Sequence, residues 1–142
     1  MPRRFSMKAT VDANILFACL IKDSTARRLF FNPALSLFSP EFIVEELLGH
    51  ILEIKGKSKL SEDELDRLIG RVLGQLTIVS DKDLRPFLPA AVSLINDPKD
   101  WLYISCALRE DTIIWSDDND FEPQKRIKVF TTRELVGIVG SL

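Results

Sequence analysis

The stretch Thr112-Ile113-Ile114-Trp115-Ser116-Asp117-Asp118-Asn119-Asp120-Phe121 joins a short apolar run directly to a cluster of acids. The apolar run predicts a buried strand, and the acids would then lie beyond its carboxyl end. A second stretch, Lys8-Ala9-Thr10-Val11-Asp12, has the same order near the N-terminus, a strand pattern followed by an acid. Because open parallel sheets place their sites beyond the carboxyl ends of the strands, the two stretches together favour a parallel sheet with an acidic site.

The rest of the chain alternates short strands with helical patterns. Further strands are predicted at residues 35–38, 76–79 and 127–130, and helices at about 14–21, 25–31, 40–51, 61–73, 84–95, 98–109 and from 132 onward. Strands that alternate with helices form parallel sheets whose two faces are covered. We therefore predict the α/β class, as a three-layer sandwich around a five-stranded parallel sheet.

Local signals predict where several helices begin. Ser39-Pro40 has the form of an N-cap followed by proline at the first helical position, and Asp97-Pro98 repeats it. Ser61 and Glu64 have the spacing of a capping box. The stretch Lys55–Lys59, which lies between two of the predicted helices, is expected to form a solvated turn.

Length and composition bound the domain organisation. The chain has 142 residues, 46% hydrophobic and 28% charged, and no apolar run reaches the roughly 18 residues that a membrane span requires. We expect a single domain over residues 1–142, with residues 1–7 as a flexible leader, located in the cytoplasm without membrane contact. Cys19 and Cys106 lie in apolar helical patterns far from CxxC spacing, which predicts two buried free thiols.

The charge balance does not by itself indicate a nucleic-acid partner, because the formal net charge is −2. Of the 21 acids, however, five are candidates for one site, and the other 16 are outnumbered by 19 Lys and Arg. The surface outside the site is therefore mildly basic. Such a surface tolerates a polyanion once metal ions neutralise the acids.

Asp100 is the most informative single acid. With 100° between successive helical residues it falls beside Ile104 and Ala107, on a helix that is apolar nearly all round. A carboxylate there loses its hydration, and an unpaired buried charge costs several kcal/mol. The alternative, an acid that only interacts with the helix dipole, is worth about 0.3–1 kcal/mol, and Asp97 already serves as the cap. We therefore expect Asp100 to be a site residue.

Helical periodicity leaves a choice between Glu45 and Glu46, which flank the apolar stripe of their helix on opposite sides. For Asp12, the alternative to a site role is a helix cap or an Asx-turn. His50 is the only histidine, which excludes a histidine acid–base pair and a zinc site built from several histidines, and a satisfied or exposed imidazole is expected there. The aromatic residues are expected to belong mainly to the core.

Clustered carboxylates with at most one histidine select hard cations, Mg²⁺ or Mn²⁺, and disfavour zinc. Like charges ~4 Å apart repel by around 4 kcal/mol per pair at intermediate dielectric, so such a cluster needs cations. Ions held in this way promote phosphodiester hydrolysis by activating a water and stabilising the leaving oxygen. The sequence leaves open whether one or two ions bind.

Four motifs, in order along nearly the whole chain, resemble the PIN-domain nucleases, including VapC-type toxins. They are Thr10-Val11-Asp12-Ala13-Asn14, Glu45-Glu46-Leu47 after Ser39-Pro40, Asp97-Pro98-Lys99-Asp100, and the stretch from Trp115 to Phe121. The resemblance implies a five-stranded parallel sheet, a Mg²⁺ or Mn²⁺ pocket, and cleavage of single-stranded RNA, commonly by a homodimer. A toxin of this kind would also have a small antitoxin as partner.

The family pattern also implies which residues are catalytic and metal-binding. Asp12 is the first acid, Glu46, which directly precedes a leucine, is the second, and Asp100 is the third. The fourth position falls near Asp118 and Asp120, which are both candidates. The register there stays open, with Asp117 as a further possibility. Family members often have Thr where this chain has Ser116, and both keep a hydroxyl beside the metals.

Two other functions compete with this interpretation of the motifs. A haloacid-dehalogenase-like phosphatase or a phospho-receiver would use Asp12 as nucleophile, but the phosphatase motif requires an acid where Asn14 stands. A catalytically inactive PIN-like domain would bind RNA or protein only. The presence of acids at all four motifs counts against that alternative.

Overall fold

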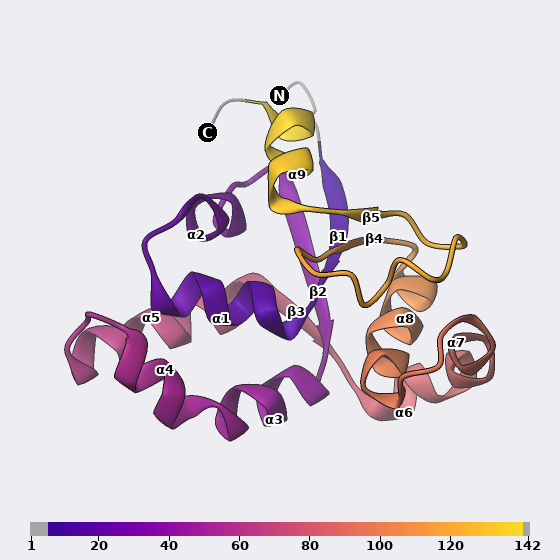
Figure 1. Ribbon diagram of the computed structural model, residues 1–142, viewed down its shortest axis with the longest axis horizontal. Helices are drawn as coiled ribbons and strands as arrows, with labels where there is room; N and C mark the ends of the chain where they lie inside the picture. The colour runs from indigo at the N-terminus through magenta and orange to yellow at the C-terminus, as the bar shows by residue number, and fades with distance from the viewer. Residues whose placement is uncertain (1–5, 141–142) are drawn as a thin grey trace.

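The computed structural model describes residues 6–140 and has a central sheet with helices on both faces (Figure 1). Within these residues five strands form one sheet in the order β3-β2-β1-β4-β5, and every neighbouring pair is parallel. The strands are β1 (Met7–Val11), β2 (Leu35–Pro40), β3 (Leu76–Val79), β4 (Ile113–Trp115) and β5 (Val129–Phe130). The predicted α/β sandwich is therefore confirmed.

The helices form two outer layers that Figure 1 shows on either side of the sheet. One layer comprises α1 (Ala13–Ile21), α2 (Thr25–Phe30), α3 (Phe42–Gly49), α4 (Ile51–Lys57) and α5 (Glu62–Gln75). The other comprises α6 (Asp81–Leu84), the 3-10 helix η1 (Arg85–Phe87), α7 (Leu88–Leu94) and α8 (Pro98–Glu110), of which α8 packs on β1, β2 and β4. The last helix, α9 (Thr132–Val139), contacts β5 and α2.

The core is centred on β1 and β4, which lie inside the sheet and are covered on both faces. Val11, Ile114 and Trp115 are fully buried, as expected for parallel strands with near-continuous apolar sequences. Val11 of β1 pairs with Trp115 of β4. The next residue along each strand, Asp12 or Ser116, therefore emerges at the same level of the sheet's carboxyl edge.

Ser39 and Pro40 do not begin a helix, so the prediction from this pair was wrong. They are the last residues of β2, where Ser39 pairs with Ile78 and donates its hydroxyl to the Val11 carbonyl oxygen at 3.0 Å. Helix α3 begins two residues later, and its N-cap makes no side-chain hydrogen bond. An N-cap is worth about 1 kcal/mol, which the pairing of β2 with strands on both sides outweighs.

The helical layers are more divided than predicted. The helix expected at 40–51 breaks at His50, and α4 then continues to Lys57 through most of the expected turn. Burial of Ile54 and the ion pair between Lys57 and Glu53 support this extra turn. The helix expected at 84–95 is likewise three short segments, α6, η1 and α7, with prolines near the start of two of them.

Several smaller predictions can also be compared with the structure. Cys19 and Cys106 are buried free thiols, as predicted. Residues 1–5 of the expected leader lie outside the described residues, and Met7, its last residue, forms the start of β1. In the part of the chain that the structure describes, no helix has the length and apolar character needed to cross a membrane.

Candidate functional site

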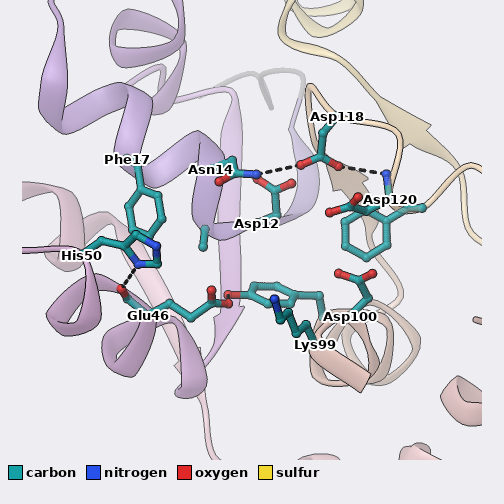
Figure 2. A pocket seen from close by; sticks show the side chains of 12 residues that line it. Asp12, Asn14, Phe17, Glu46, His50, Lys99, Asp100, Asp118 and Asp120 are labelled. Carbon is teal, nitrogen blue, oxygen red and sulfur yellow. Dashed lines mark hydrogen bonds between the residues drawn. The ribbon is translucent and has the colours of Figure 1, made fainter. Parts of the chain in front are cut away.

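A cavity of about 220 Å³ opens at the carboxyl edge of the sheet, between α1, α3 and α8. Its lining includes all five predicted site residues, Asp12, Glu46, Asp100, Asp118 and Asp120. Figure 2 shows their side chains arranged around the opening. Four separate segments contribute them: the end of β1, helix α3, the first turn of α8 and the loop after β4. The sheet order makes this convergence possible, because β4 lies beside β1.

Asp12 is positioned by the junction of β1 and α1. It is the N-cap of α1, where its Oδ1 accepts the Ile15 amide at 3.0 Å. The helix-cap role considered for Asp12 therefore applies to one of its two carboxylate oxygens. The residue is only 5% exposed. Burial raises the pKa of Asp12 to about 7, and the nearby Ser116 hydroxyl and the Ile15 amide oppose that rise.

Asp100 lies in the first turn of α8, and the structure separates it from the cap as predicted. Asp97 is the N-cap, with its Oδ1 accepting the Lys99 amide at 3.0 Å. Asp100 faces the cavity and is 7% exposed. Burial, followed by the charges of Asp120 and Asp97, raises the pKa of Asp100 to about 7. Its neutral form is therefore strongly populated near neutral pH unless a cation compensates the charge.

The structure places Glu45 and Glu46 in different surroundings. Glu45 is exposed and does not line the cavity, whereas Glu46 is half-buried and does. Tyr103, one turn beyond Asp100 on α8, donates its hydroxyl to Glu46 Oε1 at 2.9 Å. This hydrogen bond crosses from one helical layer to the other and leaves the second Glu46 oxygen available.

The loop after β4 carries three acids, of which one contacts the start of α9 and two line the cavity. Asp117 turns away from the cavity, and its two oxygens accept the amide and hydroxyl of Thr132 at 2.7 Å each, at the start of α9. Trp115 adds a bond from its Nε1 to the same Thr132 hydroxyl at 3.0 Å. Asp118 and Asp120 line the cavity instead. Of the three candidates in the uncertain register, Asp118 and Asp120 therefore lie at the cavity and Asp117 anchors the start of α9.

Asp118 is oriented by three donors. Asn14 Nδ2 donates to its Oδ2 at 2.9 Å, and its Oδ1 accepts the Ser116 hydroxyl at 3.2 Å and the Asp120 amide at 3.0 Å. Figure 2 shows the bonds from Asn14 and Asp120. Burial, and then the neighbouring charge of Asp118, raises the pKa of Asp120.

None of the five carboxylates forms an ion pair with a basic side chain of the described residues. The ion pairs within residues 6–140 involve other acids, namely Asp23, Glu53, Glu62, Asp83 and Glu110. As the side chains lie, no three His, Cys, Asp or Glu groups in the same range are close enough to hold one ion together. Hydrogen bonds instead hold Glu46 toward Tyr103 and Asp118 toward Asn14. The donor set itself, carboxylate oxygens without Cys, has the chemistry that Mg²⁺ and Mn²⁺ prefer.

Sequence reasoning missed several residues of the cavity. Tyr103 could have been found, because it lies three residues after Asp100 and therefore on the same helical face. Asn14 lies two residues after Asp12 and lines the cavity, and its role as a donor to Asp118 was not predicted. Phe17, His50 and Lys99 also line the cavity, and no local pattern distinguished them from core or surface residues. His50 is exposed, as predicted.

Comparison with known proteins gives a family match and a fold match. A family model described as PIN domain matches residues 10–136. No curated protein matches the chain. Among solved structures, the chain is similar to a chain in the structure of VapBC2 from Rickettsia felis bound to a promoter DNA fragment. The TM-score is 0.66 and the identity 15%, and the match covers 88% of this chain and 98% of that chain. PAE2754 from Pyrobaculum aerophilum has a TM-score of 0.68 and 15% identity, covering 94% and 89%. At such identities the structural likeness concerns the fold.

Proposed function

Since this chain belongs to the PIN-domain family, a family of nucleases, we propose that it is a Mg²⁺- or Mn²⁺-dependent ribonuclease that hydrolyses phosphodiester bonds of single-stranded RNA. The proposed metal-binding and catalytic residues are Asp12, Glu46, Asp100, Asp118 and Asp120. Their placement around one cavity supports this assignment.

The observation that carries the proposal is the burial of Asp12 and Asp100, neither of which forms an ion pair with a Lys or Arg among residues 6–140. Both carboxyl groups have a pKa raised to about 7, which means that the folded protein resists their ionisation. Such a cost is unfavourable for folding and is expected where function requires the charge. A divalent ion would remove the cost by supplying the missing positive charge.

Each proposed ligand has a neighbour that would orient it. The Ile15 amide holds one oxygen of Asp12, Tyr103 holds one oxygen of Glu46, and Asn14 holds one oxygen of Asp118. The ion, when bound, would supply the positive charge that phosphodiester hydrolysis requires at the phosphate. The chain's own part is to position the carboxylates and to keep a hydroxyl, that of Ser116, within the cluster.

The proposal extends to location and partners. We propose a cytoplasmic protein, a toxin with a small antitoxin as partner, and a homodimer. The likeness to a chain of the VapBC2 complex supports the antitoxin partner. Leu48 and Leu52, which are 64% and 80% exposed on α3 and α4, supply apolar surface for a contact between copies. Light scattering that gives the mass of one chain across micromolar concentrations would contradict the dimer.

The experiment compares two acids of the same helix, Asp100 and Asp97. Asp100→Asn should reduce Mn²⁺-dependent cleavage of a single-stranded RNA by orders of magnitude, because it removes a charged ligand. Asp97→Asn should leave cleavage nearly unchanged, since Asn caps a helix about as well as Asp. EDTA should abolish cleavage by the wild-type protein.

Two outcomes would overturn the proposal. Full activity in Asp100→Asn would remove the site assignment. No cleavage of any single-stranded RNA by the wild type with Mg²⁺ or Mn²⁺ would favour the alternative, an inactive PIN-like domain that binds RNA or protein.

A further inference from the structure

One wall of the acidic cavity is aromatic. Phe17 lies on α1 and His50 at the break between α3 and α4, and their ring centroids are 4.8 Å apart with 38° between the ring planes. Both line the cavity beside Glu46. Figure 2 shows the two rings on the side of the opening that lies across from Asp118 and Asp120. The carboxylates therefore face an aromatic surface.

The two rings are held in place and yet remain accessible. His50 Nδ1 lies 2.9 Å from the Glu46 carbonyl oxygen, and Phe17 packs against the imidazole. His50 is nevertheless exposed, and Phe17 is only half-buried. A planar ligand that stacks here would meet rings whose orientation is already fixed, which reduces the entropy cost of binding.

We propose that Phe17 and His50 form a stacking subsite for a nucleobase of the single-stranded substrate, beside the carboxylates that act on its phosphate. This inference rests on the proposed nuclease function and adds how the substrate is held. Aromatic side chains bind single strands by stacking on bases of any sequence.

Charge also favours a base at this position. No Lys or Arg among the described lining residues lies beside Phe17 to bind a phosphate, so this position suits the base, which is the uncharged part of a nucleotide. Lys99, on α8, is the one Lys or Arg among the described residues that line the cavity. The next phosphate along the strand therefore has a cation available on the α8 side, away from Phe17.

The test measures preference for bases rather than affinity alone. Fluorescence anisotropy compares a short oligoribonucleotide with an oligomer of equal length that consists of baseless ribose phosphates, both with Ca²⁺ to neutralise the acids without rapid cleavage. The wild type should bind the base-bearing oligomer about tenfold more tightly, the usual contribution of one base–aromatic stack. His50→Ala and Phe17→Leu should each reduce this ratio toward one.

Two further variants make the result specific. His50→Phe keeps an aromatic ring and should retain the preference for the base-bearing oligomer. If His50→Ala and His50→Phe both lose this preference, the contact depends on the imidazole itself and stacking is overturned. Phe31→Leu, at a half-buried Phe outside the cavity, should retain the ratio of the wild type.

The inference and the nuclease proposal can fail separately. If the wild type cleaves RNA but binds both oligomers equally, or binds neither measurably, the subsite is refuted while the nuclease function stands. If cleavage is absent, the nuclease function is refuted whatever the binding ratio shows.

Discussion

Glu53 of α4 and Glu64 of α5 have electrostatic surroundings opposite to those of Asp12 and Asp100 at the carboxyl edge of the sheet. Glu53 accepts a hydrogen bond from Lys57 at 2.9 Å, and this lowers its pKa. Glu64 accepts the Ser61 amide at 3.0 Å in the predicted capping box, and this backbone bond lowers its pKa. At the carboxyl edge, burial raises the pKa of Asp12 and Asp100 to about 7.

The difference separates acids that support the fold from acids that oppose it. A lowered pKa means that the charged form is more stable in the folded chain, and a raised pKa means the reverse. Ordinary selection for stability explains the first group. The second group needs another reason, and binding of a cation supplies one.

The largest expected effect on stability comes from replacing one of the two buried acids with raised pKa, Asp100, by a neutral side chain. The pKa of Asp100 is raised from 3.8 to about 7, so its neutral form contributes stability that is lost as the pH rises through about 7. Without metal, Asp100→Asn should therefore be more stable than the wild type at about pH 8, by more than about 1 kcal/mol. The gain should shrink toward about pH 5, where the wild-type group is already protonated. Thermal melts in EDTA measure this, and lower stability of the variant at both pH values would contradict it.

A smaller effect is expected for the hydrogen bond that orients Glu46. Millimolar Mn²⁺ should raise the melting midpoint of the wild type, because an ion bound only to the folded state stabilises it. Tyr103→Phe removes the donor to Glu46 and should weaken Mn²⁺ binding by about tenfold in calorimetry, as loss of an outer-shell partner does. Trp101→Phe is the control, because Trp101 lies on α8 like Tyr103 but outside the cavity. Its Nε1 donates to the carbonyl oxygen of Ile95, the C-cap of α7. Equal Mn²⁺ affinity in the Tyr103 variant and the wild type would remove the orienting role.

The smallest effect on stability is expected for the acids whose pKa is lowered, of which Glu64 is the example. Glu64→Gln keeps a capping-box side chain but loses the charge, so its melting midpoint should fall by less than about 1 °C near neutral pH. Because the pKa of Glu64 is lowered from 4.5, its contribution is lost as the pH falls, and the difference should vanish in acid. A variant that becomes more stable than the wild type as the pH rises would place Glu64 with the second group.

The fold, and the gathering of the candidate acids at one edge of the sheet, could be predicted because local and global signals agreed. Strand patterns that end in Asp12 and Ser116 indicated a parallel sheet with its site at one edge, and β1 and β4 form that edge. The resemblance to PIN-domain nucleases, drawn from four motifs, is confirmed at the level of the family. Asp100 was predicted to be buried because its helix is apolar nearly all round, and it is.

The features that the sequence did not predict correctly are those for which tertiary contacts select one of two locally possible structures. Ser39 can cap a helix or extend a strand, and its neighbours in β1 and β3 select the strand. Asp117 and Asp118 are adjacent and chemically identical, so only the position of Thr132 shows that the first anchors α9. The bond from Tyr103 to Glu46 joins residues 57 positions apart, a distance over which no periodicity carries information.

The bridge from Asp117 to Thr132 also bears on biosynthesis. Asp12, Glu46 and Asp100 leave the ribosome well before the segment that fixes the loop of Asp118 and Asp120. While Thr132 is still in the exit tunnel, that loop lacks its anchor, and β4 lacks its partner β5. We therefore expect the loop of Asp118 and Asp120 to take its final shape only after β5 and the start of α9 have been synthesised, later than the segments that carry Asp12, Glu46 and Asp100.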